Sequence, residues 1–166
     1  MLSKSPAIVL HQIKYTDTGV IVQAFTRNFG RISFLVKGIR SKKSGKFAVH
    51  LQPLTILDVE LYYREARSIQ SLKEYSVSFS PAGIQTDISK SSMAIFLGEV
   101  LTNVLREESP QAELFDFLSD AIRYLDSRKK GFANFHIAFL CALSGYLGFS
   151  PSPRKNEEDI FHNDLI

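Results

Sequence analysis

The chain has 166 residues, of which 45% are hydrophobic and 22% charged, with one cysteine and a formal net charge of +3. This globular composition suits one ordinary domain or two small ones, and a single cysteine excludes an intramolecular disulfide or a cysteine-rich zinc site. No apolar run reaches the roughly 18 residues that span a bilayer, and the first residues lack the apolar core of an export signal. We therefore expect a cytoplasmic protein without a membrane contact.

The first half of the chain is predicted to form β-strands, because apolar residues recur with period two between turn formers. Asn28-Phe29-Gly30 suits a turn between the second and third strands. A long loop separates the third strand from the fourth. Five short strands in this order favour a small, closed or partly closed antiparallel barrel, with the OB-fold as the leading candidate. The predicted strands cover residues 7–13, 20–26, 31–36, 54–63 and 67–77.

The second half of the chain has helical periodicity. The expected helices cover residues 88–105, 110–125 and 135–147, and Ser109-Pro110 is a typical helix start. The third helix is apolar nearly all round, which predicts burial among other helices. The fold class is thus α+β, with a five-stranded OB-fold barrel followed by an all-α domain. We expect domains over residues 1–80 and 81–150 and a polar tail over 151–166.

Charge is distributed unevenly between the two halves. Residues 1–80 hold 12 Lys and Arg against 5 Asp and Glu, whereas residues 81–166 hold 8 against 12. Residues 37–46 carry five cations and no acid, which suits the neutralisation of nucleic-acid phosphates. A solvated basic loop without a partner is the alternative. The predicted phosphate contacts are Lys37, Arg40, Lys42, Lys43 and Lys46, extended by Arg27, Arg31 and Lys14.

Aromatic residues in neighbouring strands are candidates for base stacking. Phe25 and Phe34 are expected in the core, since most aromatic side chains are buried. Phe29 lies in a turn and Tyr62 lies on the acidic face of its strand. These two are therefore the residues that we expect to be exposed and available to a base.

The helical half offers a second candidate site. Aromatic and apolar residues at helical spacing would line a groove for a hydrophobic peptide, and nearby cations would suit an acidic one. Ordinary packing in the core of a helical bundle explains the same spacing. The residues in question are Phe135, Phe139, Leu143 and Tyr146, with Arg123 and Lys129.

No enzyme class, metal site or cofactor is predicted. Six residues separate Gly38 from Gly45 where a phosphate-binding P-loop needs four, and Phe47 follows Lys46 where that motif has Ser or Thr. The four histidines are scattered without ligand spacing, and no serine stands in a nucleophile elbow.

Several stretches together resemble the RecO family of bacterial recombination mediators. They are Ala7-Ile8-Val9-Leu10-His11, Phe25-Thr26 before Gly30-Arg31, the segment from Val36 to Ser44, and Leu51-Gln52-Pro53-Leu54. A looser likeness continues to Gly145-Tyr146-Leu147-Gly148-Phe149. The combination of Lys-Gly-x-Arg-Ser-Lys with Leu-Gln-Pro is the most specific part.

The resemblance implies an OB-fold joined to a helical domain and a role in DNA repair and recombination. It implies binding of single- and double-stranded DNA, annealing of complementary strands, and, with RecR, help for RecA in replacing single-stranded DNA-binding protein at the nucleoid. Members of the family usually continue with more helices, many with a four-cysteine zinc module. Residues 151–166 are accordingly expected to be the start of a longer C-terminal region.

The sequence is also compatible with two other functions. One is a protein-interaction adaptor, in which the helical half binds the acidic, hydrophobic tail of single-stranded DNA-binding protein and DNA contact is secondary. The other is an OB-fold protein of translation, which would prefer structured RNA to single-stranded DNA.

Overall fold

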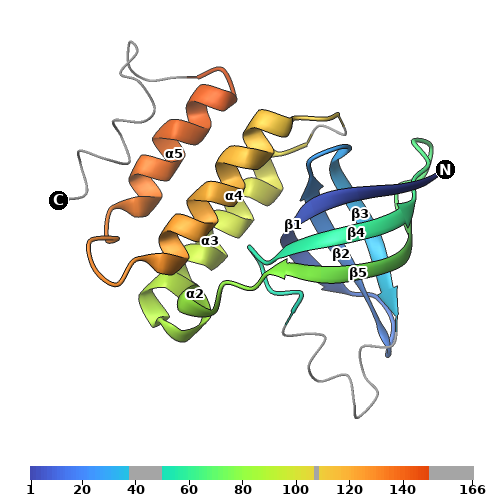
Figure 1. Ribbon diagram of the computed structural model, residues 1–166, viewed down its shortest axis with the longest axis horizontal. Helices are drawn as coiled ribbons and strands as arrows, with labels where there is room; N and C mark the ends of the chain where they lie inside the picture. The colour runs from blue at the N-terminus through green and yellow to red at the C-terminus, as the bar shows by residue number, and fades with distance from the viewer. Residues whose placement is uncertain (38–49, 107–108, 150–166) are drawn as a thin grey trace.

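The computed structural model describes residues 1–37, 50–106 and 109–149, and all statements below concern these residues (Figure 1). Strands fill the first half and helices the second, so the predicted α+β class is confirmed. The strands are β1 (Leu2–Lys14), β2 (Gly19–Thr26), β3 (Gly30–Lys37), β4 (Ile56–Tyr62) and β5 (Ser71–Phe79). The helices are α2 (Ala82–Thr86), α3 (Ile88–Val104), α4 (Ala112–Ser127) and α5 (Phe135–Tyr146).

The five strands form one antiparallel sheet in the order β3-β2-β1-β4-β5, which curls until its outer strands meet. The two outer strands touch at a parallel bridge between Phe34 and Gln70, where the Gln70 amide donates to the carbonyl of Ser33 at 2.7 Å. This contact closes the sheet at one point into the barrel of an OB-fold, as the sequence predicted.

The length of β1 makes the curl possible. Its first half, from Leu2 to Ile8, pairs with β4, and its second half, from Ala7 to Lys14, pairs with β2. A register shift between Val9 and His11 marks the region where the strand changes partners. The pattern of the sequence predicted a start at residue 7, because Ser3 to Pro6 lack the alternation of a half-buried strand. Pairing with β4 holds these residues in the sheet.

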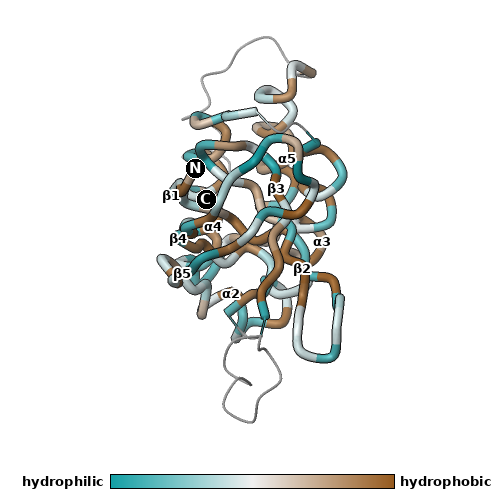
Figure 2. The backbone as a smooth tube through the Cα atoms, turned by 90° about the vertical axis from the view of Figure 1, so that its right-hand side faces the viewer, coloured by the Kyte–Doolittle hydropathy of each residue, from teal (hydrophilic) through white to brown (hydrophobic). Residues whose placement is uncertain are grey.

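β1 is buried on both faces, and this joins the barrel to the helices. Ala7 and Val9 point into the barrel interior, while Ile8 and Leu10 join the core that the helices cover. All four side chains are at most 1% exposed. Hydrophobic stretches lie along the strands, and the β1–β2 hairpin tip is hydrophilic (Figure 2). β1 therefore contributes to two cores, one inside the barrel and one between the barrel and the helices.

The helices lie on one side of the barrel, with α3 against β1 and α5 farthest from the sheet (Figure 1). Gly98 allows the close approach of α3, since a Cβ there would lie 3.3 Å from the carbonyl oxygen of Leu10. The prediction that α5 is buried among other helices holds for only one of its faces. Phe135, Phe139 and Leu143 pack into the helical core, but Ile137 on the other face is 54% exposed.

Candidate nucleic-acid interface

Two of the predicted phosphate contacts, Lys14 and Lys37, lie at the same end of the sheet. Lys14 is opposite Val20, and Lys37 is opposite the adjacent Gly19, so the two lysines are on strands either side of β2. Both side chains are exposed. The other predicted contacts in the basic segment, Arg40, Lys42, Lys43 and Lys46, lie outside the described residues and follow Lys37 directly in the chain.

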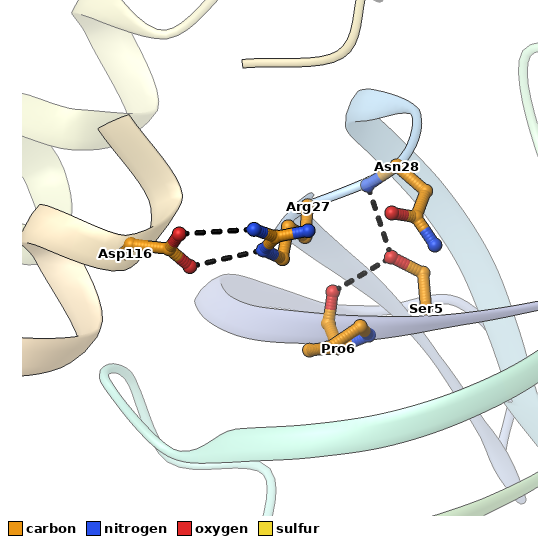
Figure 3. Close-up of polar contacts among 5 residues, drawn as sticks. All are labelled: Ser5, Pro6, Arg27, Asn28 and Asp116. Carbon is orange, nitrogen blue, oxygen red and sulfur yellow. Dashed lines mark hydrogen bonds and ion pairs between the residues drawn. The ribbon is translucent and has the colours of Figure 1, made fainter. Parts of the chain in front are cut away.

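Arg27 has a partner within the protein. From the turn between β2 and β3, its guanidinium reaches Asp116 in the second turn of α4 with two parallel hydrogen bonds of 3.0 Å, from Nε and from an Nη (Figure 3). These bonds lower the pKa of Asp116 below its ordinary value, against a smaller opposing effect of burial. The same turn is fixed to β1, where the amide of Asn28 donates to Oγ of Ser5 at 3.1 Å. Arg27 thus ties the barrel to the helices.

Arg31 makes a second link of the same kind. One Nη donates to the carbonyl oxygens of Thr102 at 2.8 Å and of Leu105 at 3.2 Å, and the other donates to Oε1 of Gln23 at 3.2 Å. The carbonyls at the C-terminal end of α3 carry partial negative charge and lack partners in the helix, so a cation there is favourable. The structure gives both predicted arginines a role in joining the barrel to the helices.

The aromatic candidates differ in their surroundings. Phe25 and Phe34 are buried, as predicted. Tyr62 is 48% exposed on β4, also as predicted. Phe29, which was expected to be exposed, is half-buried and stacks on Tyr63 with ring centroids 4.3 Å apart. Its ring face toward Tyr63 is therefore covered by the protein itself.

The predicted peptide groove on α5 is not open. Phe135, Phe139 and Leu143 are at most 2% exposed and belong to the core, so the interpretation as ordinary bundle packing holds for them. Tyr146 is 36% exposed and stacks on Phe117. Of the two cations, Arg123 lies over the ring of Phe79 at 4.4 Å, and Lys129 is exposed.

The pattern of the sequence missed an open groove where β3 and β5 separate beyond their bridge. It has a volume of about 650 Å³, within the usual range of ligand sites. The end of β3 and the start of β5 line it, including Leu35, Lys37, Ile69, Lys73 and Tyr75. Little in the sequence indicates this groove, because β5 is mostly exposed and its apolar and polar residues hardly alternate.

Comparison with known proteins places the chain in a family. The models Recombination protein O N terminal and Recombination protein O C terminal match residues 1–80 and 85–155. The DNA repair protein RecO of Phocaeicola vulgatus is 40% identical over 165 residues, which are 99% of this chain and 68% of that protein. The chain belongs to the RecO family. The DNA repair protein RecO of Bacteroides fragilis is 45% identical over 153 residues, 92% of this chain and 63% of the relative.

As a member of the RecO family the chain is a DNA repair protein, which implies interaction with DNA. It spans about two thirds of the length of these curated relatives. Within the described ranges, no helix combines the length and apolar character needed to cross a membrane. In the same ranges, no group of three His, Cys, Asp or Glu side chains is placed to hold a metal ion.

Proposed function

We propose that this chain is a non-enzymatic DNA-binding protein that holds single- and double-stranded DNA through its basic segment, residues 37–46. The observation that carries the proposal is the position of this segment in a chain of the RecO family. It follows β3 at the end of the barrel where Lys14 and Lys37 are both exposed. Lysines and arginines at such a place bind phosphates of either DNA form.

The roles of the cations divide in two. Lys14, Lys37 and the lysines and arginine that follow Lys37 contact phosphates, whereas Arg27 and Arg31 hold the barrel on the helices. Contacts to the sugar-phosphate backbone carry no sequence information, so binding is tolerant of sequence. Each contact releases counterions, so the affinity falls as salt rises.

Annealing follows from this mode of binding. A basic surface that neutralises the phosphates of two strands reduces their repulsion and leaves the base edges free to pair. In the recombination pathway, we propose that the protein acts with RecR to help RecA replace single-stranded DNA-binding protein at the nucleoid.

The test compares two pairs of adjacent lysines. The first double variant, Lys42→Glu with Lys43→Glu, alters the proposed site. The control is the double variant Lys129→Glu with Lys130→Glu, which changes the net charge by the same amount in an exposed part of the α4–α5 connection. We expect the first variant to lose at least about tenfold in affinity for both single- and double-stranded oligonucleotides, and to anneal complementary strands more slowly. Equal binding and annealing by the two variants would rule out the basic segment.

The adaptor function remains a second candidate, on a narrower surface than the sequence predicted. Lys129 is exposed, and Tyr146 is partly exposed on α5. A short acidic peptide with an apolar end, such as the tail of single-stranded DNA-binding protein, would be recognised there by charge. The Lys129→Glu, Lys130→Glu variant tests this candidate too, because it should lose binding of a labelled tail peptide while it keeps binding DNA.

A further inference from the structure

The helices cover only part of the outer face of the barrel. Ile8 and Phe25, opposite each other on β1 and β2, lie in the core between the barrel and the helices. Residues two apart on a strand share a face, so Gln23 and Ile21 lie on the same outer face of β2 as Phe25. They lead to the β1–β2 connection, which lies away from the helices (Figure 1). The outer face is therefore covered at one end of β2 and accessible at the other.

An aliphatic row crosses the accessible end of this face. Ile13 on β1 is opposite Ile21 on β2, which is in turn opposite Leu35 on β3. Ile13 is 42% exposed, and Ile21 and Leu35 are half-buried. Tyr15, two residues after Ile13, is 58% exposed. These four residues form the outer patch, and clusters of exposed apolar side chains mark interaction sites.

The polar residues around the outer patch are cationic or uncharged. Lys37 follows Leu35 on the same face of β3, and its side chain is exposed. On the other side of the aliphatic row, His11, Gln23 and Ser33 lie opposite one another on the three strands. None of these described neighbours is acidic. The outer patch is thus an apolar surface with a positive charge at one edge, which favours a partner that is apolar and negatively charged.

The composition of the outer patch favours a protein over a nucleic acid. Bases stack on aromatic rings and phosphates need several cations, whereas the described residues of this face include one tyrosine and one lysine beside three aliphatic side chains. Aliphatic side chains on a sheet pack instead against the apolar face of a helix. The barrel already does so where α3 packs on β1, with Gly98 close to the carbonyl oxygen of Leu10. A helix is about 10 Å wide, and three strands span about the same distance.

We propose that the outer patch docks an amphipathic helix of a partner protein. The apolar stripe of that helix packs on Ile13, Ile21 and Leu35, and an acidic side chain at its edge pairs with Lys37. Lys37 is also a proposed phosphate contact, so its charge is shared between the two partners. The aliphatic row serves the protein partner alone. The chain thus has a protein-binding surface beside its proposed DNA site, and the surface does not depend on that site.

The first test examines the chemistry of the partner with two synthetic peptides. Both are stapled into a helix with leucines along one face. One peptide has glutamates and glutamines at the other positions, and the second has lysines in place of the glutamates. Fluorescence anisotropy measures their binding to the intact chain, and we expect the glutamate peptide to bind at least about tenfold more tightly. Lys37→Glu, at an exposed residue, should abolish or reverse this preference.

The second test removes apolar side chains from the outer patch without changing its charge. The patch variant is Ile13→Gln with Tyr15→Ser. The control, Ile95→Gln with Ile137→Gln, changes two isoleucines that are exposed on α3 and α5. We expect the patch variant to lose at least about tenfold in affinity for the glutamate peptide and to keep its affinity for a single-stranded oligonucleotide within about twofold. The control should keep both affinities, and circular dichroism checks that both variants are folded.

The outcomes separate this inference from the proposed function. The inference is overturned if neither peptide binds, if both bind equally, or if the patch variant and the control bind the glutamate peptide alike. It is also overturned if the folded patch variant loses as much affinity for single-stranded DNA as for the peptide, because the face would then be a DNA surface. If the patch variant does not fold, the peptide preference of Lys37→Glu decides. If the intact chain prefers the glutamate peptide but binds no DNA, the proposed function fails and the inference stands.

Discussion

Lys90 is a buried cation that joins two helices. It is 4% exposed, and its ammonium group donates to the carbonyl oxygens of Asp126, at 3.1 Å, and of Arg128. These carbonyls lie at the C-terminal end of α4. The last carbonyl groups of a helix have no amide donor within the helix, and they carry partial negative charge. The ring of Phe132 lies 5.0 Å from the same nitrogen. The charge is thus satisfied by the end of a helix and an aromatic face.

Replacing this cation should destabilise the fold. Lys90→Met keeps most of the side-chain volume but leaves the two carbonyls without their donor, so we expect a loss of about 2 kcal/mol in the free energy of unfolding. Urea denaturation measures it. Lys129→Met, at an exposed lysine, is the matched control and should change stability by less than about 0.5 kcal/mol. Equal effects of the two variants would contradict the structural role of Lys90.

The Arg27–Asp116 pair should make stability depend on pH in the acid range. Because Arg27 lowers the pKa of Asp116 in the folded state, the pair stabilises the fold above the ordinary carboxyl pKa of about 3.9. This contribution is lost as the pH falls through the lowered folded-state pKa. Asp116→Asn should therefore be less stable than the natural chain at pH 7, and the difference should shrink toward zero at low pH. Asp120→Asn, on the same helix, is the control. If the loss of stability in Asp116→Asn is the same at every pH, the ion pair with Arg27 does not stabilise the fold.

At the residue scale, the sequence predicts burial better than it predicts partners. Phe25 and Phe34 are buried and Tyr62 is exposed, as predicted, whereas Phe29, whose turn position predicted exposure, is half-buried. The partners of Arg27 and Arg31 were not predictable, since Asp116 lies 89 residues from Arg27, and Thr102 lies 71 residues from Arg31. A cation near a turn looks the same in sequence whether it faces solvent or a distant helix.

At the element scale, periodicity located most strands and helices within a few residues. α3 begins at Ile88 as predicted, where Asp87 accepts hydrogen bonds from the amides of Ser89 and Lys90 as an N-cap. α2 was missed because five residues that include a glycine give no periodic signal. Which face of α5 is buried was not predicted, because apolar composition alone cannot show which face has a neighbour.

The docking of α2 on α4 gives a prediction for that short helix. A Cβ at Gly83 would lie 2.3 Å from the carbonyl oxygen of Asp126, whose carboxylate also accepts from the amide of Ile84 at 2.8 Å. Gly83→Ala should therefore lower stability by about 1–3 kcal/mol through overpacking, although alanine favours helices. Chemical denaturation measures the change, with the exposed Gln85→Ala as control. A Gly83→Ala protein as stable as the control would show that α2 does not pack closely on α4.

At the scale of the whole molecule, the predicted boundary near residue 80 separates strands from helices but does not separate their cores. Ile8, Leu10 and Phe25 of the barrel lie in one cluster with Leu97 and Leu118 of the helices. Arg27 and Arg31 add polar links across the same interface. The barrel is therefore held in a fixed orientation on the helices. Lys37, the first residue of the basic segment, lies at the same end of the barrel as Lys14.

The salt dependence of DNA binding tests the role of the basic segment most directly. Fluorescence anisotropy of a labelled single-stranded oligonucleotide would be measured across a salt series for the intact chain and for the variant Lys42→Glu, Lys43→Glu, Lys46→Glu. If the basic segment contacts phosphates, log K falls steeply with log salt for the intact chain, and the slope is smaller by about 2 in the variant, at roughly 0.7 per lost phosphate contact. Equal slopes for the two proteins, or no binding by the intact chain, would contradict it.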